Sequence, residues 1–377
     1  MGRVSENLAG ESLGESRIVT KPIRLLIAAS GTGGHLFPAI ATAEQLPDYE
    51  IEWLGVPDRL ETQLVPKQYP LHAIAVEGFQ QRFGLGTLRI FGRLTRSILQ
   101  VRQLLKQGEF HGVLTTGGYI AGPAIVAART LGLPTILHES NALPGKVTRW
   151  LSPWCSRVAL GFEAAQPYLP RAQTVCVGTP VRSKFRAALD HASPAGLSIP
   201  DNVPLIVVVG GSQGAVAVNR LVRQCAPEWF AAGAWIVHLT GENDPEAQSL
   251  SHDQYLQLPF YDDMASLLQR ANLAISRAGA GTLTELAITQ TPSILIPYPY
   301  AAEDHQSYNA AIFAAAGASQ VCRQADLSVE KLQNKVLNLL RSPDQLEQMA
   351  VAAGELAIAD SAERLADLVR SLVKQAP

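Results

Sequence analysis

The sequence predicts an α/β protein in which two domains, each built on a parallel β-sheet, face one another across a central cleft. Short apolar runs alternate with helical patterns along the chain, and this alternation is typical of parallel sheets covered by helices. It occurs in two series, and a chain of 377 residues is too long for one ordinary core. Glycine-rich loops follow several predicted strands, at the edge where ligands bind in such sheets.

The first domain is expected to span residues 22–185. Its first helix is predicted to begin near His35–Pro38 and to run to about Leu46, because proline is tolerated in a first turn. Residues 1–21 lack the apolar core of a signal peptide, so we expect a disordered extension there. Strands are predicted at about 23–29, 51–54, 71–76, 112–116, 134–138, 157–160 and 173–177.

The second domain is expected to span residues 203–357. Residues 190–204, rich in Pro, Ser and small side chains, are typical of a linker. The first helix of the second domain is predicted to run to about Cys225, and a last helical pattern covers about 360–374. Strands are predicted at about 205–209, 234–239, 254–258, 273–276 and 293–297, and helices at about 263–270, 281–289, 305–316, 327–341 and 344–357.

The composition excludes several classes of protein. Hydrophobic residues make up 47% and charged residues 17% of the chain, as in folded globular proteins. The net charge of −2 gives no electrostatic reason to expect a nucleic-acid partner. Four cysteines without a C-x-x-C pair favour a reducing compartment and argue against a zinc cluster. No run of about 18 apolar residues is present to span a membrane.

The most informative motif is the loop Ser30-Gly31-Thr32-Gly33-Gly34-His35, between the first predicted strand and its helix. Glycines let the backbone approach a ligand closely, and a helix N-terminus offers free N–H groups with partial positive charge. The loop therefore predicts an anion site with a histidine at its edge. Its spacing does not fit G-x-G-x-x-G, and the chain has no P-loop motif. The structural alternative is a tight turn whose histidine caps the helix.

Three further glycine loops stand in the same position, between a strand and a helix. They are Thr115–Tyr119, Gly210–Gly214 and Ser276–Thr282, and the last leads into a helix that carries Glu285. Each loop alone is weak evidence, because strand-to-helix turns often need glycine for structural reasons. Four such loops, two in each domain, predict two anionic ligands in one cleft.

Polar residues also follow two apolar strands. Glu139 and Asn141 lie in the string His138-Glu-Ser-Asn141, at a strand's carboxyl end, where ligands bind in open α/β sheets. The structural alternative is an Asn-capped turn. The string Asp304-His-Gln-Ser-Tyr-Asn309 follows a proline-rich loop, and Asp304 there is also a candidate helix N-cap.

The strings GTGGHLFPA, TTGGYIAGPA, HESNALPG, GTPVR, GGSQGAVAVN, SRAGAGTLTE and DHQSYNA occur in this order. Together they resemble the MurG family of bacterial peptidoglycan glycosyltransferases, over roughly residues 22–375. The resemblance implies the GT-B architecture, with two Rossmann-like domains and a last helix, about 358–377, that packs back on the first. It also implies inverting transfer of N-acetylglucosamine (GlcNAc) from UDP-GlcNAc to undecaprenyl-diphospho-N-acetylmuramoyl-pentapeptide, with no required metal and no cofactor.

The resemblance also implies which residues form the site. The motif HEQN stands here as HESN, so that Glu139 and Asn141 match the family and Ser140 departs from it. On the acceptor side the matching residues are Thr32, Gly33, Gly34, His35, Gly117, Gly118, Tyr119 and Asn141. On the donor side they are Arg182, Ser212, Gln213, Gly214, Asn219, Ala280, Thr282, Glu285 and Gln306, with Arg182 at the phosphate and Glu285 at the ribose hydroxyls.

Inverting sugar transfer needs a base for the acceptor hydroxyl and positive groups for the departing UDP. His35 is the candidate base because histidine titrates near neutrality. Glu139, or a relay through Asn141, is the rival. The charge of the leaving group is expected to fall on Arg182, Ser212 and the helix starts near Gly214 and Ala280.

Residues 78–107 combine basic and apolar side chains and contain no Asp or Glu. Such a segment in a nearly neutral protein indicates contact with an anionic membrane surface. We therefore expect peripheral attachment at the cytoplasmic face of the plasma membrane. The alternative is an amphipathic crossover helix with a solvated basic face.

Two other functions remain open from the sequence. Another GT-B transferase with a different lipid acceptor would keep Glu285 but is expected to lack the GTGGH and HESN pair. A non-catalytic sugar-nucleotide-binding protein would not need His35, Glu139 and Arg182 together. A turnover assay with a lipid-linked muramoyl acceptor separates all three.

Overall fold

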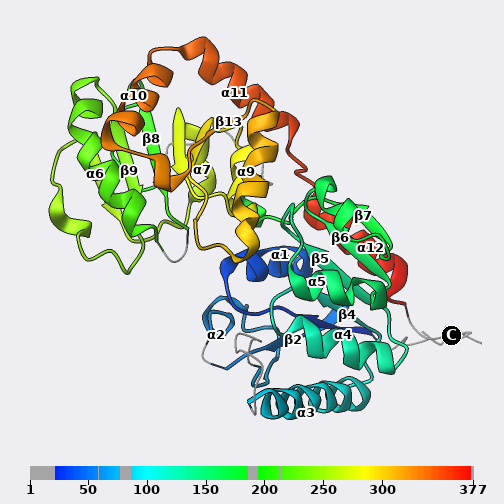
Figure 1. Cartoon of the computed structure of the whole chain (residues 1–377). Coiled ribbons are helices and arrows are strands. Elements are labelled where there is room, and N and C mark those ends of the chain that lie inside the picture. The colour runs from blue at the N-terminus through cyan, green and yellow to red at the C-terminus, as the bar shows by residue number, and fades with distance from the viewer. Residues whose placement is uncertain (1–21, 58, 77–85, 186–193, 212–213, 375–377) are drawn as a thin grey trace, which may run out of the picture.

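The computed structural model describes residues 22–57, 59–76, 86–185, 194–211 and 214–374 of the chain. The predicted extension at 1–21, the donor-loop residues Ser212 and Gln213, and residues 78–85 of the basic segment lie outside these ranges. The described chain forms two parallel sheets, each covered by helices (Figure 1). The predicted α/β class with two sheet domains is therefore confirmed.

The first sheet has seven strands in the order β3-β2-β1-β4-β5-β6-β7, and every neighbouring pair is parallel. Apolar, mostly β-branched or leucine side chains fill its central strands, as expected of a sheet buried on both faces. The strands are β1 (Ile23–Ala28), β2 (Tyr49–Gly55), β3 (Leu71–Ala73), β4 (Gly112–Thr115), β5 (Thr135–Glu139), β6 (Arg157–Leu160) and β7 (Thr174–Cys176).

The second sheet repeats this topology with six strands in the order β10-β9-β8-β11-β12-β13, again all parallel. Its strands are β8 (Leu205–Val209), β9 (Trp235–Leu239), β10 (Tyr255–Leu258), β11 (Leu273–Ser276), β12 (Ser293–Leu295) and β13 (Ser319–Val321).

In both sheets the strand order reverses beside the first strand, so that β1 pairs with β4 and β8 pairs with β11. Crossover connections on the two sides of such a point run in opposite directions, which leaves a crevice at the carboxyl ends of the two strands. The four glycine loops are those that follow β1, β4, β8 and β11. The topology thus places all four at the two reversal points.

Alternate residues of the central strands pack against helices on opposite faces. In β1, Leu25 and Ile27 pack with residues of α1 and α12, while Leu26 and Ala28 pack with residues of α3 and α4. The helices are α1 (Gly33–Ala43), α2 (Glu61–Leu64), α3 (Gly86–Gln107), α4 (Ala121–Thr130), α5 (Lys146–Leu151), α6 (Val216–Ala231), α7 (Met264–Arg270), α8 (Ala280–Ile288), α9 (His305–Ala315), α10 (Val329–Leu340), α11 (Pro343–Glu355) and α12 (Ser361–Leu372).

The last helix, α12, lies on the first domain, so the chain returns to the domain in which it begins (Figure 1). Leu365 and Val369 are fully buried in the same cluster as the residues of β1. The hydroxyl of Tyr49 donates to the carbonyl of Val373 at 2.7 Å, and Arg370 pairs with Asp48 at 3.1 Å. These contacts fix the C-terminal segment to the first sheet.

The predicted elements differ from the structure at several ends. α1 begins at Gly33 and ends at Ala43, so Pro38 lies in its second turn and not in its first. α6 continues beyond Cys225 to Ala231, because burial of Trp229 in the second core outweighs the cost of Pro227 inside the helix. The short edge strand β13 and the helix α2 were not predicted, since neither contains a long apolar run.

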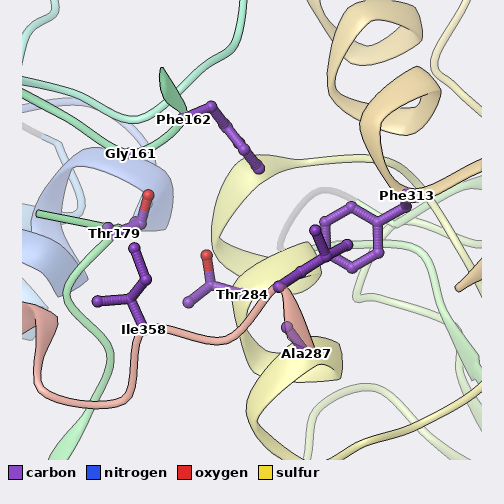
Figure 2. A pocket seen from close by; sticks show the side chains of 9 residues that line it. Gly161, Phe162, Thr179, Thr284, Ala287, Phe313 and Ile358 are labelled. Carbon is purple, nitrogen blue, oxygen red and sulfur yellow. The ribbon is translucent and has the colours of Figure 1, made fainter. Parts of the chain in front are cut away.

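A small pocket lies where the chain crosses between the domains (Figure 2). Phe162 and Thr179 line it from the first domain, Thr284 and Phe313 line it from the second, and Ile358 belongs to the segment that leads into α12. The segment that leads into α12 packs closely against Gly178, whose φ is +80°. A Cβ atom there would lie 2.8 Å from Cβ of Ile358.

We predict that Gly178→Ala destabilises the protein more than Gly233→Ala. Both glycines have a positive φ, +80° and +83°, so both variants carry the cost of a left-handed alanine, about 1–2 kcal/mol. Only at position 178 does the new methyl group meet packed atoms, because nothing lies within 4 Å of a Cβ at Gly233. The extra cost is about 1–3 kcal/mol. Equal thermal midpoints for the two variants would show that the crossing segment is not tightly packed there.

Candidate functional site

The loop after β1 is held open by a buried carboxylate. Gly31 has a φ of +107°, and the helix begins two residues later with Thr32 at its N-cap and no side-chain cap. Glu61 is fully buried and accepts from the Ser30 hydroxyl at 2.5 Å and the Gly31 N–H at 3.2 Å. No side chain caps the N–H groups at the start of α1, while Glu61, whose role the sequence did not reveal, fixes the loop that precedes them.

His35 is fixed by the loop that follows β4. Its Nδ1 lies 2.7 Å from the carbonyl oxygen of Thr116, and the Thr116 hydroxyl donates to the His35 carbonyl at 2.9 Å. A carbonyl oxygen only accepts, so Nδ1 carries the proton and Nε2 of the neutral ring holds a free electron pair. A Cβ at Gly117 would lie 3.3 Å from Cε1 of His35. The glycines of the second loop thus allow the backbone to pack against the imidazole.

Glu139, at the end of β5, directs its carboxylate into its own loop. One oxygen accepts from the backbone N–H and the side-chain amide of Asn141, at 3.0 and 3.1 Å. The other accepts from the Gly145 N–H at 3.1 Å and the Thr148 hydroxyl at 2.7 Å. With four donors and only 6% of its surface exposed, Glu139 shapes the loop between β5 and α5.

His138 and Ser140 lie on either side of Glu139 in the chain and are both buried. His138 donates through Nε2 to the carbonyl of Gly178 at 2.9 Å, and burial lowers the pKa of this histidine. The Ser140 hydroxyl lies 3.4 Å from Nδ1 of His138. The serine that replaces the family's glutamine therefore faces His138.

Arg182 and Glu285 form an ion pair that joins the two domains. Nη2 of Arg182 donates to Oε1 of Glu285 at 3.1 Å, and the guanidinium lies 5.0 Å from the ring centre of Phe37 on α1. Burial raises the pKa of the Glu285 carboxyl, and the charge of Arg182 opposes that shift. Nε of Arg182 is buried and has no hydrogen-bond partner among the described residues.

The start of α8 is organised by the neighbouring helix α9. Gly279 is the N-cap and offers no side chain, so no side chain caps the N–H groups around Ala280 and Thr282. Oε1 of Gln306 accepts from the N–H groups of Ala278 and Tyr298, at 3.2 and 2.9 Å. The amide oxygen of Gln306 is therefore used within the protein, and its amide nitrogen is the group it can direct to a ligand.

Arg277 is a buried cation next to this loop. Its guanidinium donates to the carbonyls of Ile296 and Pro297, at 3.0 and 3.2 Å, and to Oε1 of Gln324 at 2.7 Å. It makes no ion pair among the described residues, and burial lowers its pKa. Neutral groups hold this charge, so it adds positive potential near the start of α8.

Asn219 uses its side chain within the second domain. It is fully buried, and its amide nitrogen donates to the Thr240 carbonyl at 2.9 Å and to Asp244 at 2.8 Å. Its amide oxygen accepts from Nε2 of His238 at 3.0 Å. A Cβ at Gly214 would lie 2.7 Å from that same Thr240 oxygen. The predicted donor contact is therefore corrected: Asn219 holds Thr240, against which the glycine loop packs.

Hydrogen bonds join His35 to the loop after β4, Asn141 to α9 and Arg182 to Glu285, and Tyr119, 45% exposed, lies on the loop after β4. Within the described residues, no three His, Cys, Asp or Glu side chains are grouped so as to hold a metal ion. None of the described helices has both the length and the apolarity to cross a bilayer.

Two family models match the chain. The N-terminal domain of glycosyltransferase family 28 matches residues 25–160, and the C-terminal domain of the same family matches residues 205–365. The two matches fall on the two sheets described above.

Relatives match almost the whole chain. UDP-N-acetylglucosamine–N-acetylmuramyl-(pentapeptide) pyrophosphoryl-undecaprenol N-acetylglucosamine transferase of Nostoc punctiforme is 69% identical over 355 residues, which cover 94% of this chain and 99% of the relative. A protein of the same name from a Nostoc species is 68% identical, with 95% and 100% covered. The crystal structure of Acinetobacter baumannii MurG is 30% identical with a TM-score of 0.75, and 93% and 100% of the two chains are covered. With the two sheets, this likeness confirms the GT-B fold.

We predict that Glu139→Gln lowers the thermal midpoint, because an amide nitrogen would then face donors that need an acceptor. Each lost hydrogen bond to the carboxylate is worth about 1.5–3 kcal/mol. The matched control is Glu163→Gln, since Glu163 is exposed, and it should leave the midpoint unchanged. A Glu139→Gln protein of wild-type stability that has lost all turnover would instead favour Glu139 as the base.

Proposed function

The chain belongs to glycosyltransferase family 28, and from this premise we propose that it transfers GlcNAc from UDP-GlcNAc to undecaprenyl-diphospho-N-acetylmuramoyl-pentapeptide in peptidoglycan synthesis. The transfer is inverting and needs no metal. The observation that carries the assignment of the site is the contact of Arg182 with Phe37, two residues after His35. This contact brings the ion pair with Glu285 against α1, the helix whose first turn carries His35.

The donor is bound on the second domain, residues 203–357, together with Arg182. The unpartnered Nε of Arg182 supports a phosphate contact, because guanidinium binds phosphate oxygens in pairs. Glu285 accepts from the ribose hydroxyls, and the N–H groups at Ala280 and Thr282, which no side chain caps, suit a diphosphate. Gly214 and the amide nitrogen of Gln306 complete this side, with Ser212 and Gln213 proposed from the resemblance alone.

The acceptor is bound on the first domain, residues 22–185, which also carries the helix from about residue 358 onward. The diphosphate of the lipid carrier is bound by the backbone N–H groups of Thr32, Gly33 and Gly34 at the start of α1. The loop after β4, with Gly117 and Gly118 at positive φ, lets the backbone approach it closely. Tyr119 lies on the same loop and offers a hydroxyl and a ring to the sugar.

His35 is the general base of this reaction. Its proton on Nδ1 is bound to the Thr116 carbonyl, so Nε2 is free to take the proton of the acceptor hydroxyl as the oxygen attacks the anomeric carbon. The bond from that carbon to the diphosphate then breaks, and UDP leaves with its charge held by Arg182 and the helix starts. Glu139 acts as a positioning residue, because its four donors already use both oxygens.

The basic segment 78–107 attaches the enzyme to the cytoplasmic face of the plasma membrane, where the lipid acceptor lies. In the described part of α3, Arg96, Leu99 and Lys106 are exposed at spacings of three and seven residues, which place them on one face of the helix. Val101 and Leu105 are buried against the first core, so the exposed face points away from it. α3 lies on the outer side of the first domain (Figure 1).

We predict different kinetic effects for substitutions at His35 and at Glu285. His35→Asn keeps a donor near the Thr116 carbonyl but has no group in the place of Nε2, so kcat should fall by about 10²–10⁴ with UDP affinity unchanged. Glu285→Gln should weaken UDP binding and raise the donor KM, because a charged acceptor for two hydroxyls is lost. Turnover of UDP-GlcNAc with the lipid-linked acceptor, and calorimetric titration with UDP, measure both. Near wild-type kcat in His35→Asn would make the histidine structural.

We also predict that the double variant Arg96→Glu, Lys106→Glu binds anionic vesicles about 30-fold or more weakly, since each basic residue contributes about 1 kcal/mol. The control is Arg171→Glu, Arg341→Glu, which changes the net charge equally at exposed positions off α3. Turnover on a long-chain acceptor in vesicles should fall with binding, while turnover on a soluble short-chain acceptor should persist. Equal losses on both acceptors would mean that α3 shapes the acceptor pocket.

A further inference from the structure

Asn309 on α9 connects the acceptor-side loop to the donor-side loop and is fully buried. Its amide oxygen accepts from the N–H of Ala142 at 2.8 Å, and its amide nitrogen donates to Oδ1 of Asn141 at 3.1 Å. Both partners belong to the first domain. The same nitrogen donates to the carbonyl of Ala278 in the second domain, also at 3.1 Å. One side chain therefore holds both domains at the point where the proposed ligands meet.

The orientation of this amide is determined by its partners. A backbone N–H only donates and a backbone carbonyl only accepts, so the oxygen must face Ala142 and the nitrogen must face Ala278. Asn141 in turn donates to the Glu139 carboxylate. A continuous chain of hydrogen bonds thus runs from Glu139 through Asn141 and Asn309 to Ala278.

On the donor side, α9 holds the Ala278 peptide from both ends. Gln306 accepts from its N–H, and Asn309, one turn later, donates to its carbonyl. This peptide directly precedes Gly279, the N-cap of the helix that carries Glu285. A displacement of α9 therefore moves the start of α8 with it.

The turn that leads into α9 has an unusual backbone. Glu303 and Asp304, neither of them glycine, have φ values of +53° and +57°. Such residues cost about 1–3 kcal/mol each and persist where the surrounding contacts require them. Glu303 pairs across the domains with Arg149 at 2.5 Å, on the exposed side of the same joint. This turn directly precedes the helix whose Asn309 reaches the first domain.

We infer that Asn309 is a positioning residue that fixes the acceptor loop and the donor loop in one relation, so that the base and the anomeric carbon are aligned. The inference rests on the proposed transfer reaction. Asn309 contacts neither substrate in this role and acts through Asn141 and Ala278. Misplacing reacting groups by about 1 Å costs about 10²-fold in rate.

The test compares Asn309→Ala and Asn309→Asp with Asn338→Ala, which alters an exposed asparagine on α10. Asn309→Asp keeps the shape but places an oxygen against the Ala278 carbonyl and Oδ1 of Asn141. We expect kcat/KM for transfer to fall by about 100-fold in both Asn309 variants, with UDP affinity within a few-fold of the wild type. An equal loss of UDP affinity and of thermal midpoint, with kcat unchanged, would make Asn309 merely structural and overturn the inference.

A double-mutant cycle gives the sharper result. If Asn141 and Asn309 act through one another, the variant Asn141→Ala, Asn309→Ala loses no more kcat/KM than either single variant. Additive losses would overturn the inference. Asn141→Ala removes the same hydrogen bond between Asn141 and Asn309. If Asn309→Ala does not fold, the loss of kcat/KM in Asn141→Ala still measures the effect of that bond.

Small-angle X-ray scattering of the ligand-free protein tests whether Asn309 holds the two domains together, and it requires no turnover of substrate. We expect a larger radius of gyration for Asn309→Asp than for the wild type and for Asn338→Ala. An unchanged radius of gyration would overturn the inference that Asn309 holds the two domains together, whatever the activity. Suppose that the wild type has no turnover on the lipid-linked acceptor, but that Asn309→Asp shows the expected larger radius of gyration. The proposed function would then be refuted, while the contact of Asn309 with both domains would be supported.

Discussion

The reversal of strand order beside β1 and β8 is the constraint on which the rest of the molecule depends. Where parallel strands separate in opposite directions, neither crossover covers the carboxyl ends of the central pair, and the helix starts there stay open. Both sheets use the same order, so two such openings are available, and the domain arrangement turns them toward each other. Backbone N–H groups at these helix starts then contribute positive potential, to which the charge of Arg277, which neutral groups hold, adds.

The fold and the glycine loops could be predicted because the information is local. A glycine such as Gly31 or Gly118 favours a turn with positive φ, and apolar runs of four or five residues predict strands. The roles of Glu61, Asn219 and Asn309 could not be predicted, because each depends on partners brought together from distant parts of the chain. A buried carboxylate that organises a loop and one that acts as a base look alike in a sequence, and only the four donors around Glu139 separate them.

The two charges that meet between the domains are paired before any ligand arrives. Arg182 and Glu285 neutralise each other across the domains, so neither is left as an isolated charge in a poorly solvated cleft. A nucleotide diphosphate with its ribose offers the same two complements, anionic oxygens for the guanidinium and hydroxyl donors for the carboxylate. Ligand binding can therefore exchange one set of partners for another at a smaller desolvation cost than two separate free charges would carry.

The return of α12 to the first sheet restricts the motion between the domains. The chain passes from one domain to the other twice, once between Phe185 and Leu205 and once between Glu355 and Ser361. A body held by two covalent tethers cannot spin freely, and its softest degree of freedom is rotation about the line through both tethers. Gly178 packs against the second tether at Ile358, so this tether is held on the first domain, and the two connections together limit how far one sheet can turn relative to the other.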